Sequence, residues 1–336
     1  MNYTISINSS DKTTKIRQVV NKMKSDIEKG LLLPGNQVAS ITSFSKTIGV
    51  ARETIEKAYN ILKEEGYLTS VAGKGNFVCI VPDKKIKVLM ILNKMSSYKK
   101  EVYEAFIDKL GDRAVVDLQI HHYDPKRFRD IVFENRGKYH HFVVMPHFYL
   151  HTDPGEYIDL LKTFSSKELI ILDKEISLGE GFANVYQDFK LDIFDSFMAN
   201  KAFFDKYNHI TMIFPKDSHH PEEIKQGVLR FCEIQKKSFT IIPGSQKAAI
   251  EAHKLFITLT ETDLAALIKS IRETSLVLGE DIGIVSFNET VLKELLGVSV
   301  VTTDFAAMGT RAAEMILSND FIKTRNPFHM IRRQSL

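Results

Sequence analysis

The chain has 336 residues, 44% of them hydrophobic and 26% charged, with a formal net charge of +3 at pH 7. This composition is typical of soluble globular proteins, and the length allows two or three domains. Two cysteines, Cys79 and Cys232, are too few for a disulfide framework or a structural zinc site, and they suit a reducing compartment. No apolar run reaches the roughly 18 residues of a membrane span, and the N-terminus does not resemble a signal peptide, so we expect a cytoplasmic protein.

The positive charge is concentrated in the first eighty residues. They contain 11 Lys and Arg but only 7 Asp and Glu, whereas the rest of the chain contains 34 basic and 35 acidic residues. An excess of positive charge in one segment is what contact with a phosphate backbone requires.

The same segment predicts three short helices. Apolar residues at positions 16, 19, 20, 23 and 27 recur at helical spacing, and Gly30 ends this first helix. Ser40 can cap a second helix that runs to about Ile48. Gly49 permits a sharp turn into a third helix, which begins near Ala51 and ends at Gly66.

A small hairpin follows the helices. Two short strands, Tyr67–Ser70 and Asn76–Ile80, are joined by Ala72-Gly73-Lys74-Gly75. Three helices with a turn and a glycine-bearing wing are how small domains place one helix in the DNA major groove. The sequence therefore predicts a DNA-binding domain.

Four segments of this region make the prediction more specific. They are Ile27–Gly35, Ile48–Ile55 (Ile-Gly-Val-Ala-Arg-Glu-Thr-Ile), Leu62–Leu68, and Gly73–Val78 (Gly-Lys-Gly-Asn-Phe-Val). In order and spacing, over about the first eighty residues, they resemble the winged helix-turn-helix of the GntR family of bacterial transcription regulators.

The resemblance implies a set of DNA-contacting residues. Arg52, at the start of the third helix, would read guanine with its guanidinium, and Lys74 would lie at the wing tip. The full set implied is Ser40, Thr42, Ser43, Lys46, Arg52, Thr54, Lys57, Gly73, Lys74 and Gly75. The family usually has Pro-Ser-x-Arg before the second helix, where this chain has Ala39-Ser40-Ile41-Thr42. A second base-reading arginine is therefore missing, and we expect an operator that differs from the family's usual one.

From Lys87 onward, short apolar runs alternate with segments of helical composition. The runs are Val88–Leu92, Val115–Ile120, Phe142–Met145, Leu169–Leu172, Ile210–Phe214, Phe239–Ile242, Phe256–Leu259 and Ile282–Phe287. Such alternation predicts parallel sheets with helices on both faces, here as two doubly wound lobes. Ligands of such sheets bind beyond the carboxyl ends of the strands.

The last part of the chain resembles the effector domain of the LacI family, a fold shared with type I periplasmic sugar-binding proteins. The segments that carry the resemblance are Phe256–Thr262, Gly279–Thr290, Val301–Gly309 and Ile331–Ser335. Order and spacing hold from about Asp173 to the end, whereas the likeness of residues 87–172 is one of topology. A GntR-type head on a LacI-type body is similar to the arabinose-repressor subgroup.

This resemblance implies an effector site between the lobes. The matching positions are Asp173, Thr260, Thr262, Asn288, Glu289 and Phe305, with His147, Lys94 and Tyr98 as further candidates at the ends of other strands. Carboxylates, amides and hydroxyls bond sugar hydroxyls, and an aromatic face covers the C–H side of the ring. Two positions depart from the family: Ile224 replaces a frequent arginine, for which Glu222 or Lys225 are the candidate substitutes, and Asn288 replaces a common aspartate.

The sequence thus predicts three parts. Residues 1–80 form the winged helix-turn-helix, 81–86 a linker, and 87–336 an effector-binding and dimerisation domain. Within the last part we expect one lobe at about 87–184 and 302–325, and the other at about 185–301 and 326–336.

We interpret the chain as a cytoplasmic, homodimeric repressor of carbohydrate-utilisation genes whose affinity for double-stranded operator DNA is altered by a monosaccharide. A regulator that senses an amino acid or a purine derivative is one alternative. A carbohydrate enzyme with a fused DNA-binding head is another, although no phosphate-binding loop or nucleophile elbow occurs. We expect no catalytic residue, no cofactor, no metal site and no membrane contact.

Overall fold

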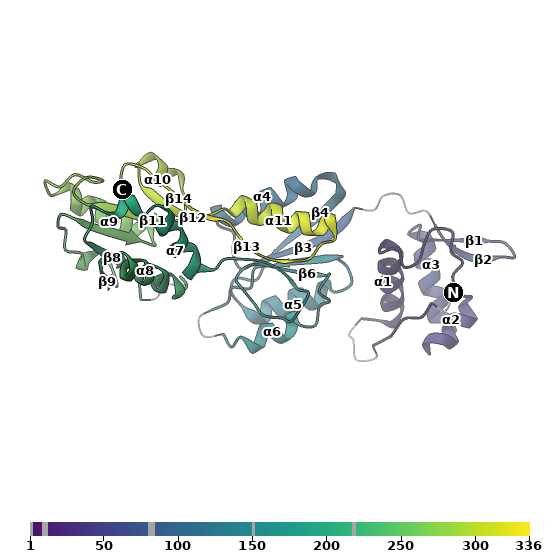
Figure 1. Cartoon of the computed structure of the whole chain (residues 1–336). Coiled ribbons are helices and arrows are strands. Elements are labelled where there is room, and N and C mark those ends of the chain that lie inside the picture. Colours follow the sequence, from purple (N-terminus) through teal and green to yellow (C-terminus); the bar gives the residue numbers. More distant parts are fainter. Residues whose placement is uncertain (1–2, 9–12, 80–84, 150–151, 217–219) are drawn as a thin grey trace. The chain divides into compact units, whose positions relative to one another are not determined.

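The protein consists of a helical N-terminal domain followed by two open six-stranded sheets with their helices (Figure 1). These features come from a computed structural model. The structure describes residues 3–8, 13–79, 85–149, 152–216 and 220–336.

The N-terminal domain has the elements that the sequence predicts. They are α1 (Lys15–Glu28), α2 (Ile41–Ile48), α3 (Arg52–Glu64), β1 (Leu68–Val71) and β2 (Gly75–Val78). The Ser40 hydroxyl caps α2 by accepting a hydrogen bond from the Ser43 N–H at 3.1 Å. Gly49 ends α2 at φ 66°, a left-handed conformation that favours glycine and turns the chain into α3.

Apolar faces of the three helices bury one another in this domain. Val19, Val20 and Met23 of α1 meet Phe44 of α2 and Ile55 of α3 in the core, all of them fully inaccessible to solvent. The Tyr59 hydroxyl donates to the Ala39 carbonyl at 2.9 Å and so links α3 to the segment before α2. This packing fixes the orientation of α2 and α3, the two helices of the predicted helix-turn-helix.

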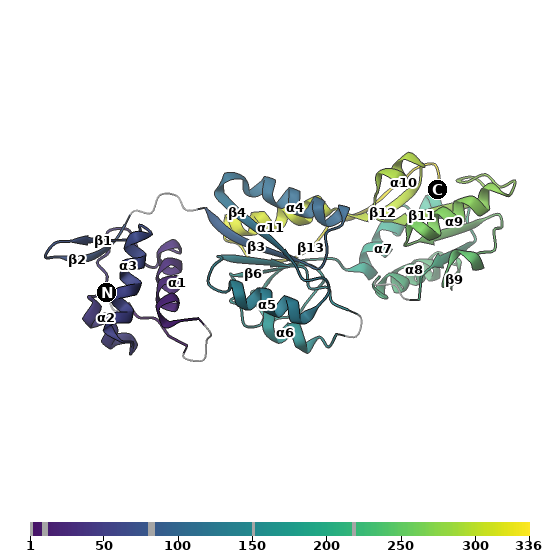
Figure 2. The ribbon, with the colours of Figure 1, turned by 180° about the vertical axis from the view of Figure 1, so that it is seen from behind.

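The first of the two large sheets has the strand order β13-β7-β6-β5-β3-β4. Its strands are β3 (Ile86–Leu92), β4 (Ala114–Ile120), β5 (His141–Val144), β6 (Leu169–Asp173), β7 (Ala183–Tyr186) and β13 (Lys323–Arg325). The helices that accompany it are α4 (Ser97–Leu110), α5 (Pro125–Asn135), α6 (Gly155–Leu161), α11 (Phe305–Ser318) and the 3₁₀ turn η1 (Gly111–Arg113). Figure 2 shows α4 and α11 on one face of this sheet and α6 on the other.

The second sheet has the order β14-β12-β11-β10-β8-β9. Its strands are β8 (His209–Ile213), β9 (Ser238–Ile242), β10 (Lys254–Thr258), β11 (Gly283–Phe287), β12 (Ser299–Thr303) and β14 (Phe328–Ile331). Its helices are α7 (Phe189–Ala199), α8 (Glu223–Ile234), α9 (Glu261–Arg272) and α10 (Val291–Leu295), with 3₁₀ turns η2 (Lys201–Phe204) and η3 (Ser245–Lys247). Alternate residues of β10 face opposite sides: Leu255 and Ile257 pack with α7 and α8, and Phe256 packs with α9.

Two glycines allow helices to approach unusually closely. A Cβ at Gly227 of α8 would lie 2.1 Å from the Ile193 side chain and 2.5 Å from the Lys190 carbonyl of α7. A Cβ at Gly309 of α11 would lie 2.1 Å from the Val102 carbonyl of α4. Both helix pairs therefore pack backbone against backbone.

The predicted fold class is confirmed, with differences in detail. All eight predicted apolar runs coincide with strands, but β7, β12, β13 and β14 were not among the predicted strands. The strand pairs β6–β7, β7–β13, β8–β9, β8–β10, β10–β11 and β11–β12 are parallel, whereas β14 pairs antiparallel with β12. β7 and β12 extend to Tyr186 and Thr303, two residues past the lobe boundaries that we expected. Most of the predicted linker lies outside the described residues, and β3 already begins at Ile86. No helix of the described residues is long and apolar enough to span a membrane.

Candidate functional site

The N-terminal domain presents basic side chains that form no ion pair with any residue that the structure describes. Arg52 and Lys57 on α3, Lys46 on α2 and Lys74 on the wing are all exposed. By contrast, two lysines of α1 are paired with carboxylates, Lys22 with Asp26 at 2.9 Å and Lys24 with Glu65. Arg52, Lys57, Lys46 and Lys74 are therefore available to phosphates, as are Lys15 and Arg17 of α1, which are also exposed and without an ion pair among the described residues.

The remaining predicted DNA contacts have local structural roles as well. Ser40 caps α2, Thr42 and Ser43 are exposed in its first turn, and Thr54 is half-buried in the first turn of α3. Gly73 and Gly75 have φ values of 71° and 102°, so the tip of the wing requires residues without a Cβ. The Gln37 amide donates to the Lys74 carbonyl at 2.5 Å and ties the wing to the domain.

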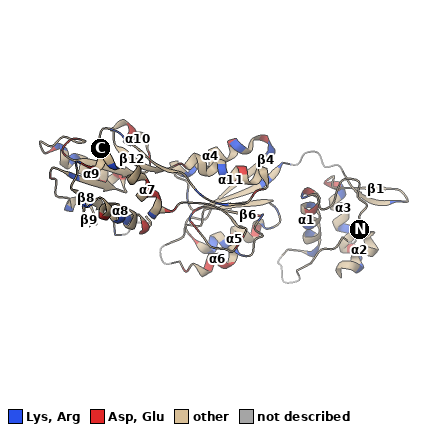
Figure 3. Cartoon of the chain, in the orientation of Figure 1, with Lys and Arg blue, Asp and Glu red and all other residues tan. Residues whose placement is uncertain are grey.

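Acidic and basic residues are interspersed over the helices of the whole chain (Figure 3).

The carboxyl ends of the first sheet's strands carry a chain of hydrogen-bonded polar groups. His147, after β5, places Nε2 2.6 Å from Oδ2 of Asp173, the last residue of β6. The Gln187 amide, after β7, donates to the other oxygen of Asp173, and the Thr303 hydroxyl of β12 donates to the Gln187 carbonyl. Burial alone would raise the pKa of Asp173, but His147, Lys99 and Gln187 outweigh it and lower this pKa to about 2.

A lysine and two aromatic rings adjoin this cluster. Lys99 of α4 donates to the buried side-chain oxygen of Asn93, and its burial lowers its pKa to about 8 although the Asp173 carboxylate opposes that shift. Tyr98 stacks on Phe305 with ring centroids 5.1 Å apart and planes inclined by 22°. Burial raises the pKa of Tyr98 to about 12, aided by the carboxylates of Glu261 and Glu289. Lys94 is exposed at the end of β3.

The corresponding ends of the second sheet are arranged differently. The Thr260 hydroxyl accepts from the Asp263 N–H at 3.1 Å and donates to the Asp263 carboxylate at 2.7 Å, which caps α9. Glu289 is held by Arg333 at 2.6 Å and by the Thr290 N–H at 2.8 Å. Thr262, in the first turn of α9, is exposed.

Asn288 is a predicted residue whose side chain remains available to a ligand. Its amide forms no hydrogen bond with the described residues and is partly exposed after β11. Below it, the buried ammonium of Lys293 donates to the carbonyls of Phe287 at 2.5 Å and Asn288 at 2.9 Å. Burial lowers the pKa of Lys293 to about 8 against the opposing carboxylates of Glu261 and Glu289.

Asp173 and Asn288 share a strained backbone. Their φ values are 74° and 60°, in the left-handed region that few non-glycine residues occupy. Such conformations concentrate at ligand-binding and catalytic sites. Asp173 is the last residue of β6, and Asn288 directly follows β11 of the other sheet. Both side chains therefore lie at the strand ends where open α/β sheets bind ligands.

Sequence reasoning missed several members of these clusters. Gln187 directly follows β7, and recognition of that strand would have placed it with the other strand-end residues. Lys99 and Lys293 gave no signal, because a lysine in an amphipathic helix is normally exposed. Ile224, the position where the family often has arginine, is buried in the core, and Glu222 pairs with Lys225 at 2.6 Å.

A winged-helix domain with unpaired cations, followed by a doubly wound body with polar strand ends, defines a DNA-binding regulator with a ligand-sensing fold. Residues 15–78 match the family model described as bacterial regulatory proteins of the gntR family. The chain is similar to the HTH-type transcriptional repressor YtrA of Bacillus subtilis, with 26% identity over 104 residues, which cover 31% of this chain and 77% of that protein.

Known structures match most of the chain. The trehalose repressor of Escherichia coli superposes with a TM-score of 0.59 at 14% identity, covering 74% of this chain and 100% of that one. A periplasmic binding protein/LacI transcriptional regulator of Alkaliphilus metalliredigens, complexed with D-xylulofuranose, superposes with a TM-score of 0.53 at 10% identity, covering 74% and 98%. The protein is thus a transcriptional regulator with a gntR-type winged helix-turn-helix and a body of the LacI, or periplasmic-binding-protein, fold.

Proposed function

We propose that this regulator is a repressor of carbohydrate-utilisation genes and that a monosaccharide bound between the two lobes of its body alters its affinity for operator DNA. One observation carries the proposal: the strand ends of both sheets present polar side chains from left-handed residues, Asp173 in one and Asn288 in the other. A site formed from both sheets would close when a ligand joins them, as in hinge-type binding proteins.

The chemistry of these strand ends suits a polyol. The Asp173 carboxylate orients His147, while Asn288 and Thr262 retain donors and acceptors for hydroxyl groups. The stacked Tyr98 and Phe305 rings offer apolar surface to the C–H side of a sugar. One structural neighbour is named as a trehalose repressor, and another is complexed with D-xylulofuranose. Both names support a sugar as the ligand class.

In the proposed mechanism, sugar binding changes the equilibrium between two arrangements of the body and so the separation of the DNA-binding domains. Coupling of about 1–3 kcal/mol would change operator affinity about 5- to 150-fold. Two domains on paired half-sites are required for useful affinity, so we propose a homodimer as the active form.

The short helix α10 is the surface that we propose for dimer formation. Val291 and Leu295 are 79% and 80% exposed, and Leu292 and Leu296 extend the same apolar surface. Exposed apolar surface of this kind marks interaction sites. A two-fold contact places the same patch of both subunits opposite each other, and apolar side chains can pack against their own copies in that way.

The first experiment is a thermal-shift screen against monosaccharides and their phosphates, followed by titration of each hit against a fluorescent operator fragment obtained by selection from random DNA. A ligand that binds only the folded state raises the melting temperature. A hit that also releases or tightens DNA supports the proposal. Silence of the panel at millimolar concentration, with amino acids or purines active instead, would replace the sugar by those ligands.

Variants separate the parts of the proposal. Arg52→Ala should abolish specific operator binding and leave sugar binding intact, whereas Arg127→Ala, an exposed arginine of α5, should change neither. Leu295→Asp should shift the sedimentation coefficient from dimer to monomer at micromolar concentration. A wild-type dimer in Leu295→Asp would exclude α10 as the interface.

A further inference from the structure

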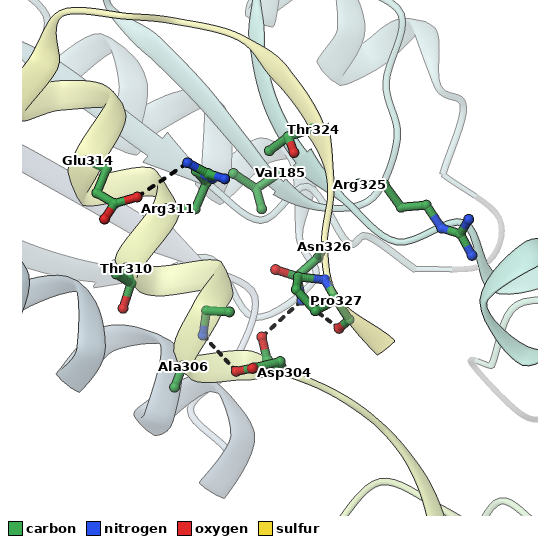
Figure 4. Close-up of a pocket in the computed structure, with 11 residues that line it drawn as sticks. Val185, Asp304, Ala306, Thr310, Arg311, Glu314, Thr324, Arg325, Asn326 and Pro327 are labelled. Carbon is green, nitrogen blue, oxygen red and sulfur yellow. Dashed lines mark hydrogen bonds and ion pairs between the residues drawn. The ribbon is translucent and has the colours of Figure 1, made fainter. Parts of the chain in front are cut away.

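Two groups of polar side chains lie outside the sites described above, and they differ in how accessible they are. The first lines a cavity of about 400 Å³ beside α11 (Figure 4). In it Asp304 caps α11, and Arg311 contacts Glu314 at 3.4 Å. The side-chain oxygen of Asn326 has no partner among the described residues, but it is buried. The second group lies on the wing of the N-terminal domain and includes an exposed amide, that of Gln37.

The segment before α2 runs along the wing. Gln37 pairs with Phe77 of β2 in an antiparallel bridge, and the Val38 N–H donates to the Asn76 carbonyl at 3.0 Å. Three residues later Ser40 caps α2, so at most about 11 Å of chain separates Gln37 from the start of that helix. Gln37 therefore lies between the wing and the first turn of α2, two elements that we expect to contact DNA.

The side chain of Gln37 reaches the tip of the wing. Its amide N–H donates to the Lys74 carbonyl at 2.5 Å. Because that carbonyl can only accept, the amide nitrogen and not the amide oxygen faces Lys74, which fixes the orientation of the group. A Cβ at Gly75 would lie 3.2 Å from this nitrogen. The amide therefore packs directly against the backbone of the wing tip.

The rest of this amide is available to a partner. Its second N–H and its carbonyl oxygen form no hydrogen bond with the residues that the structure describes. The side chain of Lys74 is exposed at the same tip. Phosphate contacts position a protein on DNA, whereas donors and acceptors read the base edges. The tip of the wing thus combines a phosphate-binding cation with a donor–acceptor pair.

The expected position of α3 indicates which groove the amide faces. The wing follows α3 closely, because β1 begins at Leu68, four residues after α3 ends at Glu64. A recognition helix lies in the major groove, and the groove beside it is the minor groove. There a G·C pair presents the guanine N3 acceptor and the N2 amino donor, whereas an A·T pair presents acceptors only. The free N–H and the carbonyl oxygen of Gln37 complement both groups of guanine.

We propose that Gln37 is a further base-reading residue and that its amide recognises a guanine in the minor groove, beside the bases that α3 contacts. The amide N–H would donate to guanine N3, and the amide oxygen would accept from the N2 amino group. The bond to Lys74 holds the amide in place before DNA binds, which lowers the entropic cost of the contact. Such a contact adds specificity to a domain in which Arg52 is the single arginine of α2 and α3.

The test begins with selection of duplexes from random DNA by the wild-type chain and by Gln37→Ala. The variant should lose a G·C preference at one position of each half-site, beside the bases that α3 reads. In the wild-type duplex, inosine then replaces that guanine, which removes the N2 amino group and preserves the major-groove edge. Inosine should weaken wild-type binding about fivefold or more and leave the affinity of Gln37→Ala unchanged, as measured by fluorescence anisotropy.

A matched control separates base reading from support of the wing. Asn60→Ala removes another exposed amide, more than two turns after Arg52 on α3, and should keep the wild-type affinity and response to inosine. Both variants should keep the wild-type melting temperature. If Gln37→Ala weakens binding of the guanine and inosine duplexes equally relative to the wild type, Gln37 only supports the wing. That result, or a wild-type affinity that inosine does not change, would overturn the proposal.

Discussion

The polar side chains at the strand ends of the two sheets are held in different ways. In the first sheet, Asp173 is enclosed by His147, Gln187 and Lys99, so its carboxylate holds other side chains in place. In the second, Asn288 is left without a side-chain partner among the described residues, while Lys293 holds the backbone beneath it. One end therefore preorganises its polar groups, and the other keeps a polar group available.

The largest expected effect on folding is at Asp173. Asp173→Asn keeps a residue that tolerates a positive φ and removes the charge, which leaves half-buried Lys99 without its anionic neighbour. We expect the free energy of unfolding at pH 7 to fall by about 3 kcal/mol, measured by urea denaturation. Asp159→Asn, which breaks an exposed pair with Lys162, should cost less than about 0.5 kcal/mol. Equal stability of both variants would show that the Asp173 network is not structural.

Lys293, which is buried, and Lys99, which is half-buried, predict a rise in stability at alkaline pH. Lys99 and Lys293 have pKa values lowered to about 8 from 10.5, so between these values the unfolded chain binds more protons than the folded one. Stability therefore rises with pH across this window, on the order of 1 kcal/mol per lysine.

The measurement compares the wild type with Lys293→Met in denaturant titrations at pH 8 and pH 10. The wild type should gain stability relative to the variant as pH rises. Lys269→Met, at an exposed position of α9, is the control and should show a constant difference. A pH-independent difference for Lys293→Met would mean that this ammonium titrates normally.

A smaller effect is expected at the two threonines of α9. Thr260→Ala removes the N-cap and should lower the free energy of unfolding by about 1 kcal/mol, whereas Thr262→Ala should change it by less than about 0.5 kcal/mol. Thermal unfolding of both variants is the measurement. If the sugar site uses Thr262, the second variant should lose sugar affinity while keeping its melting temperature.

Asn288 is expected to matter least for folding and most for the ligand. Asn288→Gly accepts the same φ and removes the side chain, so stability should stay within about 0.5 kcal/mol while sugar affinity falls about tenfold or more. Asn319→Gly, another left-handed asparagine at the end of α11, is the matched control and should bind sugar normally. The measurement is calorimetric titration of both variants with the sugar. Unchanged sugar affinity of Asn288→Gly would remove this residue from the proposed site.

The boundaries of the N-terminal domain could be predicted because local signals set them. Ser40 caps α2, and Gly49 and Gly66 occupy left-handed positions that end helices. In the body, the apolar runs identified the central strands. β13 and β14 were not predicted because they are short edge strands whose residues are exposed or half-buried, so they lack an apolar run. β12 was not predicted either, because its buried residues include the polar Thr302 and Thr303 and so do not form a continuous apolar run.

The predicted site residues were harder to place, because their roles depend on partners far away in the sequence. Glu289 is held by Arg333, 44 residues later, and Asp173 receives Gln187 from a strand that the sequence did not reveal. Whether a polar residue at a strand end faces a ligand or another side chain is a property of tertiary packing. Residue type and spacing alone cannot decide it.

The order of strands also has a consequence for the synthesis of this protein. Residues 323–331 supply β13 to one sheet and β14 to the other, so both sheets receive an edge strand from the same short stretch near the C-terminus. Neither sheet can be completed on the ribosome before this stretch emerges. A premature stop shortly after α11 would thus remove an edge strand from both sheets at once.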